Sequence, residues 1–266
     1  MVLQTAPSSN VMILLLSMLR IHSSTIKPCH RNDLHLEKCI IDAVYAVRPL
    51  LATGDLGDGF MTPPLEPLLL DNIDMSRGKQ FRAVFSDIQA RGGSNFIIDK
   101  LKANASAIAY DISLTLPKIE FVGKYLMKLN ILVLDLQGKG DMKGSFGTCF
   151  SIGCIDFLSN SDLFTENAKA SVKMRGTRYL KDGVEYVKFT KMPIRLHVSS
   201  MKLYLDNLFN GDKTLGEVGN NIINENQELY LNEIIPGLEK GLAEKFLIVA
   251  NRILETATFD EMFPLN

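Results

Sequence analysis

Apolar and polar residues alternate with a helical period at both ends of the chain and with a strand period in the middle. Between Asp33 and Leu51, apolar residues recur at intervals of three and four, which predicts an amphipathic helix. Asp33 is placed to cap its first turn, and Pro49 and Gly54 mark its end. A proline-rich connector follows at residues 62–67, where we expect extended backbone.

The middle of the chain predicts a series of strands. Residues 108–116 alternate large apolar side chains with Ala, Asp, Ser and Thr, and Pro117 ends this strand or marks a sheet edge. The other stretches with a period of two are 121–133, 168–174, 179–189 and 194–205, with turns expected at Arg175-Gly176 and 181–183. Strands that follow one another without intervening helices favour antiparallel pairing.

The last fifty residues return to a helical period. Apolar positions between about Glu217 and Thr258 predict roughly 40 helical residues, which would span about 60 Å. We expect either a kink near Pro236-Gly237 or two separate helices that meet at Pro236. A helix this long needs a long partner, and a curved antiparallel sheet wrapped along it would provide one. The predicted class is therefore α+β.

The first residues predict a targeting segment. Val11–Leu19 is an apolar run far shorter than the roughly 20 residues that span a bilayer, and small polar residues follow it. We interpret residues 1–23 as a signal peptide of a secreted, extracellular protein, with 24–266 as a single domain; a buried first helix is the alternative. After its removal, we expect no stable membrane insertion.

Composition narrows the choice of partner. The 266 residues are 46% apolar, which is enough for a folded core, and 29 Lys+Arg against 30 Asp+Glu leave a net charge of −1. A nucleic-acid partner is disfavoured, because no basic excess or stripe is present. The 21 aromatic residues include no Trp.

Motifs for catalysis are lacking. The glycine-rich stretch 138–144 is one residue too long for a dinucleotide loop and predicts a hairpin turn, and 210–214 predicts another turn. No GxSxG elbow is present, and no pair of carboxylates stands out as acid and base. The sequence therefore favours a protein that is not an enzyme and has no cofactor.

The sequence contains few signals for metal binding or covalent modification. The four cysteines lack CxxC spacing, and His30 and His35 stand near the start without partners, so we expect no metal site. His197 fits a packed or surface strand residue. Asn104 begins an Asn-Ala-Ser sequon, a candidate glycosylation site if the protein is secreted. Cys29 and Cys39 follow the predicted cleavage point and would pair in an oxidising compartment; two unpaired thiols are the alternative.

Several segments resemble the insect takeout and juvenile-hormone-binding protein family. They are Cys29 with Cys39, 63–68 (PPLEPL), 94–96 (SNF), 114–117 (LTLP), 203–216 (LYLDNLFNGDKTLG), 223–226 (INEN) and Phe263-Pro264. The resemblance implies a long helix wrapped by a strongly curved antiparallel sheet, a super-roll of the TULIP-like kind, around an elongated hydrophobic tunnel. It also implies pairing of Cys29 with Cys39.

The family resemblance implies a secreted carrier, which we expect to be a monomer, that binds one lipophilic ligand such as a juvenile-hormone-like terpenoid or a fatty acid. Alternatives are a secreted signalling or interaction protein without a ligand, or a hydrolase of lipophilic esters. The predicted tunnel-lining residues, each of which could instead be plain core, are Tyr110, Leu114, Leu116, Tyr125, Met127, Leu242, Phe246 and Val249.

Two features depart from the family pattern. Gln227 stands where family members commonly have Trp. Residues 147–163 form an atypical insertion between two strands and carry Cys149 and Cys154. This segment is either a retained short intron or a surface insertion, and the two cysteines would form an optional loop bridge.

Overall fold

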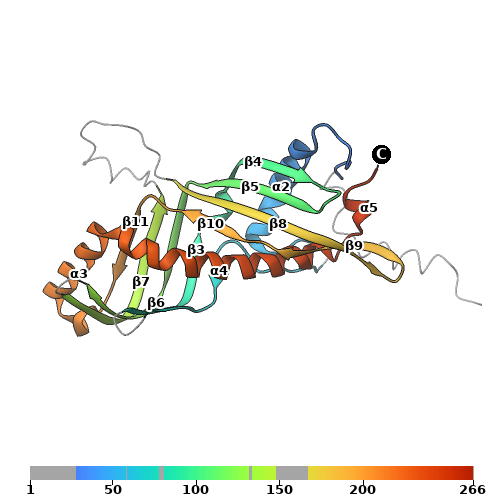
Figure 1. Cartoon of the computed structure of the whole chain (residues 1–266). Coiled ribbons are helices and arrows are strands. Elements are labelled where there is room, and N and C mark those ends of the chain that lie inside the picture. Colours follow the sequence, from blue (N-terminus) through green and yellow to red (C-terminus); the bar gives the residue numbers. More distant parts are fainter. Residues whose placement is uncertain (1–27, 58, 78–80, 132–133, 148–166, 266) are drawn as a thin grey trace, which may run out of the picture.

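The computed structural model describes residues 28–57, 59–77, 81–131, 134–147 and 167–265 (Figure 1). The predicted signal peptide, residues 148–163 of the predicted insertion, and both Cys149 and Cys154 lie outside these residues. In chain order the helices and strands are α2 (Leu36–Thr53), β1 (Leu68–Leu70), β2 (Ile73–Arg77), β3 (Phe81–Arg91), η1 (Gly93–Asn95), β4 (Ile97–Asn104), β5 (Ala109–Leu116), β6 (Lys118–Ile131), β7 (Leu134–Gly147), β8 (Ala168–Lys181), β9 (Val184–Lys191), β10 (Ile194–His197), β11 (Met201–Leu205), η3 (Phe209–Gly211), α3 (Lys213–Glu225), α4 (Gln227–Leu254) and α5 (Phe259–Met262).

The described strands form two antiparallel sheets. The first sheet has the order β1-β3-β6-β7-β11, with β2 also paired to β3, and the second has the order β10-β8-β5-β4, with β9 also paired to β8. Figure 1 shows α4, in red, crossing the length of the molecule past strands of both sheets. This arrangement confirms the predicted α+β class and the long C-terminal helix with antiparallel sheets as its partner.

The first helix is confirmed, but its start differs from the prediction. Helix α2 begins at Leu36, because the Asp33 carboxylate accepts a hydrogen bond from the His35 N–H at 2.8 Å and so shapes the turn before the helix. Gly54 ends the helix in a left-handed conformation (φ 79°), and its N–H donates to the Leu50 carbonyl.

The long C-terminal helix breaks at Asn226 and not at Pro236, so the predicted position of the break was wrong. Asn226 ends α3 by donating from its backbone and side chain to the Ile222 carbonyl, while Pro236 lies inside α4. Ile234 and Leu238, on either side of Pro236, are packed against the core of the first sheet, and this packing offsets the one backbone hydrogen bond that proline cannot make.

Residues 138–144 form part of strand β7, which corrects the predicted hairpin turn. Gly138 and Gly140 pass close to residues 206–208, and a side chain on Gly144 would overlap the Phe121 ring. Glycine here permits close approach between neighbouring segments, and the same is true of Gly176 beside Lys188, where the predicted Arg175-Gly176 turn is instead a register shift within β8.

Two other strand predictions differ from the structure. The stretch 194–205 is two strands, β10 in the second sheet and β11 in the first, so the chain changes sheets between them. Strands β1 to β4 were missed altogether. The turn at 181–183 is confirmed, with Asp182 and Gly183 in the left-handed region, and β5 ends at Leu116, directly before Pro117.

Amide side chains from α3 occupy the open edge of β11. Asn220 accepts a hydrogen bond from the Leu205 N–H at 2.8 Å and donates to the Leu205 carbonyl at 2.9 Å. Asn224, one helical turn later, makes the same pair of bonds with Leu203 at 2.9 and 2.8 Å. Each asparagine therefore replaces the backbone of a neighbouring strand.

The helices cap further strand edges in the same way. The additional contacts are Gln227 Oε1 with Met201 N–H (2.6 Å), Glu239 Oε1 with Leu196 N–H (2.8 Å), and Asn251 with both the N–H and the carbonyl of Phe189 (2.7 and 2.9 Å). Gln227 thus has a structural partner on β11. These bonds fix α3 and α4 against both sheets and thereby position the space between them.

Candidate ligand cavity

An apolar cavity of about 360 Å³ lies between the two sheets, α2 and α4. Helix α2 contributes Ile40, Ile41 and Val44, which lie on the apolar face that its period predicts. Strands of both sheets form the remaining walls. All of the described side chains that line the cavity are hydrophobic, so they would cover a ligand with apolar surface in place of water.

Helix α4 supplies one continuous wall. Ile234, Leu238, Leu242 and Phe246 recur every four residues and therefore lie along one face of the helix. From the first to the last of them the helix rises about 18 Å. The cavity is consequently elongated along α4, a shape that suits a chain-like ligand.

Four of the eight residues predicted to line a tunnel line this cavity. Leu114 and Leu116 reach it from β5, and Leu242 and Phe246 reach it from α4. Val249, one turn beyond Phe246 on α4, is half-buried but does not line it.

Tyr110 lies on the same face of β5 as Leu114 but beyond the end of the cavity. Its ring packs against Phe189 and Phe263, with centroids 6.0 and 6.4 Å apart, in the buried cluster of the second sheet. Burial raises the pKa of Tyr110 to about 12. Tyr110 is therefore a core residue of the second sheet.

Tyr125 and Met127 are also outside the lining. Both lie on β6 and belong to the buried cluster of the first sheet, other members of which do line the cavity. The Tyr125 hydroxyl donates to the Asp206 carbonyl, and burial, reinforced by the Asp206 charge, raises its pKa. Met127 is 6% exposed and packed. These two residues support the wall without forming it.

The other lining residues were not predicted, although the spacing of apolar residues in the sequence indicated some of them. Ile40 and Val44 belong to a helix face that the spacing predicted, but nothing in the sequence pairs this face with α4. Phe85 and Ile88 come from β3, a strand that the pattern did not reveal. A register shift between Ser86 and Gln89 interrupts the alternation that would have marked it.

Grooves on the outer face of the first sheet differ in chemistry from this cavity. Two of them, of about 750 and 1210 Å³, are open to solvent and share Lys143 and Tyr204 in their linings. Charged residues such as Glu120 and Asp141 also line them. The apolar cavity between the sheets is therefore the stronger candidate for a lipophilic ligand.

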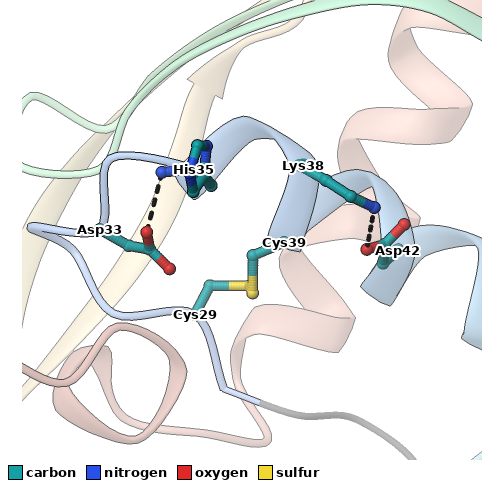
Figure 2. The surroundings of a disulfide bond; sticks show 6 residues. All are labelled: Cys29, Asp33, His35, Lys38, Cys39 and Asp42. Carbon is teal, nitrogen blue, oxygen red and sulfur yellow. Dashed lines mark hydrogen bonds and ion pairs between the residues drawn. A yellow bond between two sulfur atoms is a disulfide. The ribbon is translucent and has the colours of Figure 1, made fainter.

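The Cys29–Cys39 disulfide fastens the segment before α2 to the first turns of that helix (Figure 2). Cys29 is 4% exposed, and its N–H donates to the Met262 carbonyl, while the Arg31 N–H donates to the Pro264 carbonyl. The start of the described chain is thus held against its end. Through α2, the disulfide also supports the wall formed by Ile40 and Ile41.

Other candidate sites carry little chemistry. Across the described ranges, no group of three or more His, Cys, Asp or Glu side chains could hold a metal ion. His197 is exposed at the end of β10. Asn104 is exposed at the end of β4, where its side chain accepts from the Ala107 N–H at 2.9 Å. None of the helices that the structure describes is long and apolar enough to cross a membrane.

Comparisons with known proteins agree with this architecture. The family model described as haemolymph juvenile hormone binding protein matches residues 11–153 and 159–264, so the match is interrupted within the predicted insertion. The circadian clock-controlled protein daywake of Drosophila melanogaster is 22% identical over 209 residues, covering 75% of this chain and 74% of the relative; daywake of Drosophila yakuba matches with the same identity and coverage. The crystal structure of Epiphyas postvittana Takeout 1 superposes with a TM-score of 0.73 at 20% identity, over 90% of this chain and all of that one, and so shares the fold.

Proposed function

Because this chain belongs to the haemolymph juvenile hormone binding protein family, we propose that it is a secreted carrier that holds one lipophilic ligand in its apolar cavity. The family consists of binding proteins for lipophilic ligands. The observation that carries the proposal is the elongated cavity of about 360 Å³ in which every lining side chain that the structure describes is hydrophobic. Such a wall offers a terpenoid or an acyl chain continuous apolar contact.

Burial of apolar surface supplies the binding free energy. Each Å² of ligand surface removed from water contributes about 25 cal/mol, so an acyl or terpenoid chain needs few directed contacts. The cavity wall is built on α4, α2 and both sheets, and the amide contacts of α3 and α4 hold these elements in place. A preformed wall reduces the ordering that binding requires.

An extracellular location is part of the proposal. The apolar run Val11–Leu19 supports a signal peptide at residues 1–23, after which 24–266 would be a single, monomeric domain. A Cys29–Cys39 disulfide is typical of an oxidising compartment. Asn104 and Ser106 are both exposed, as N-glycosylation of the sequon would require.

Native mass spectrometry of the secreted protein tests the proposal. The protein purified from insect-cell medium should carry one bound lipid of a few hundred daltons, and organic extraction should remove this added mass. Re-addition of methyl laurate to the extracted protein should restore a one-to-one complex. A single mass under all three conditions would contradict the carrier function. Release of laurate from methyl laurate during the incubation would instead favour an esterase.

A further inference from the structure

The outer face of the second sheet carries a group of exposed lysines. On β5, Ile112 and Leu114 line the cavity, so the alternate residues of this strand face away from it. Two residues of β4 and two of β8 are registered opposite those outward positions, and they are Lys100, Lys102, Lys169 and Lys173. We call these four residues the lysine patch.

The lysine patch is compact. Lys102 and Lys173 are registered opposite Asp111 from either side, so their backbones lie two strand spacings apart, about 10 Å. Lys169 and Lys173 are on the same strand, with a separation along it of about 13 Å. A single extended anion could therefore contact all four ammonium groups.

Few acidic groups oppose the patch. None of its lysines has an ion-pair partner among the residues that the structure describes. The Asp111 carboxylate is already paired with Arg175 at 2.7 Å, and Asp99 accepts a hydrogen bond from the Thr115 hydroxyl at 2.8 Å. Because the whole chain has a net charge of −1, the positive charge of this face is a local excess. Its lysines come from strands far apart in the sequence, so no basic stripe appears there.

The outer face of the first sheet has a different character. There, Lys124 pairs with Asp87 at 3.0 Å, and Val122 is 51% exposed beside them on β6. Between the lysines of the patch, in contrast, lie short hydroxyl side chains such as Ser113 and Ser171. A surface of unpaired lysines and hydroxyls suits a hydrophilic polyanion, whereas entry into a lipid layer needs large apolar side chains.

Sulfated polysaccharides have the chemistry that this face would recognise. They present several fixed negative charges along a hydrophilic chain, so ammonium groups can pair with sulfates while serine hydroxyls donate to sulfate oxygens. We propose that the lysine patch binds a sulfated glycan of the cell surface or extracellular matrix. This inference rests on the proposed extracellular location. The cavity lies on the opposite face of the same strands, so the protein can hold a lipid and a glycan at once.

Three forms of the full-length secreted protein test the inference. All carry Ser106→Ala, which removes the sequon of Asn104 at the end of β4. The parent form has no other change. The patch variant adds Lys100→Gln, Lys102→Gln, Lys169→Gln and Lys173→Gln. The control variant loses the same charge from exposed positions on the outer face of the first sheet, through Lys128→Gln, Lys139→Gln, Lys143→Gln and Lys202→Gln. The probe is a heparin dodecasaccharide, titrated calorimetrically in about 0.15 M NaCl.

The parent form should bind the dodecasaccharide, and added NaCl should weaken this binding because salt screens exposed charges. The patch variant should bind at least about tenfold more weakly, since the losses at four exposed contacts multiply, and the control variant less than about threefold more weakly. All three forms should unfold at similar temperatures. They should also bind methyl laurate equally, as measured by the rise in unfolding temperature when it is added.

Failure of the parent form to bind the dodecasaccharide, or equal losses in both variants, would overturn the inference. The same holds if the parent binds vesicles of equal parts phosphatidylcholine and phosphatidylserine more tightly than the dodecasaccharide and the patch variant does not, because the partner would then be a membrane. If the patch variant unfolds at a clearly lower temperature, the pair Lys102→Gln and Lys173→Gln should still weaken glycan binding about threefold, and an unchanged affinity would overturn the inference. Glycan binding without methyl laurate binding would contradict the carrier function alone.

Discussion

Tyr110 illustrates how its surroundings change the chemistry of one side chain. It is 6% exposed between Phe189 and Phe263, and this burial raises its pKa to about 12. The folded protein therefore holds the phenolic proton more tightly than the unfolded chain, whose tyrosines titrate near pH 10. Stability from this source is complete below pH 10 and is lost as the pH rises through about 12.

We predict that Tyr110→Phe makes the protein less sensitive to alkali. The wild type should lose on the order of 2–3 kcal/mol of unfolding free energy through Tyr110 as the pH rises from 10 to 12, and the variant should lack this part of the decline. Urea unfolding at intervals between pH 9 and 11.5 measures the slope. Tyr204→Phe, at an exposed position, is the control, and equal slopes for wild type and Tyr110→Phe would contradict the prediction.

The glycines of β7 show that residue type alone can predict the wrong local structure. The stretch 138–144 has the composition of a turn, yet it runs through β7 because residues 206–208 and Phe121 pass so close that side chains would overlap them. The neighbours that require glycine belong to other segments of the chain. The sequence shows that a glycine is present, but only the folded structure shows which neighbouring segment lies too close for a side chain.

Elements that bury one face were predictable, and those that depend on distant partners were not. Helix α2 and the C-terminal helical region follow from their periods, because each presents one apolar face to the core. Strand β3 contains a register shift and Asp87 at φ 52°, and β4 carries polar residues on both faces, so neither shows a clean alternation. The break at Asn226 depends on the contacts that the asparagines of α3 make with β11, which adjacent residues do not reveal.

The edge contacts of α3 should contribute strongly to stability. Asn220→Ala would leave the buried N–H and carbonyl of Leu205 without partners, and we expect it to lower the unfolding free energy by about 2–4 kcal/mol. Asn221→Ala, at the next and exposed position, should change it by less than about 0.5 kcal/mol. Urea denaturation of both variants checks this prediction. Similar midpoints for the two would show that β11 does not depend on the amide.

The disulfide should stabilise α2 and the segment that precedes it. Replacement of Cys29 and Cys39 together by Ser should lower the unfolding free energy by about 2–3 kcal/mol, chiefly because the unfolded chain gains freedom. Chemical denaturation of the double variant measures the loss, and the wild type under reducing conditions should show a similar midpoint. An unchanged midpoint in both experiments would mean that the hydrogen bonds of Cys29 and Arg31 to the C-terminal residues suffice.

For the molecule as a whole, the sequence predicts which side of a strand or helix faces inward. It does not predict how far the cavity extends along that side. Leu114 and Leu242 were identified because a period places a residue on a face. Tyr110 and Leu114 share a face of β5, and the period cannot tell that one packs against Phe189 while the other meets open space. The two residues differ because side chains from other elements reach Tyr110 but leave space beside Leu114, and only the tertiary structure determines this.

Filling the cavity should reduce ligand capacity without unfolding the protein. Leu242→Trp adds an indole to the middle of the α4 wall, so we expect at least a tenfold loss of affinity for methyl laurate and a smaller change for a shorter ester such as methyl hexanoate. Ile248→Trp places the same side chain where Ile248 is 67% exposed and should bind normally. Ligand-dependent unfolding temperatures compare the two, and normal binding by Leu242→Trp would place the ligand elsewhere.

The asparagine and glutamine contacts along β11 also bear on how the protein behaves at high concentration. An uncovered strand edge is a template on which another molecule can add its own strand, and polymers grow in this way. The side chains of Asn220, Asn224 and Gln227 occupy the donor and acceptor positions that an incoming strand would need. An incoming strand would therefore find these backbone groups already bonded, so the amides that hold α3 in place also oppose strand addition between molecules at this edge.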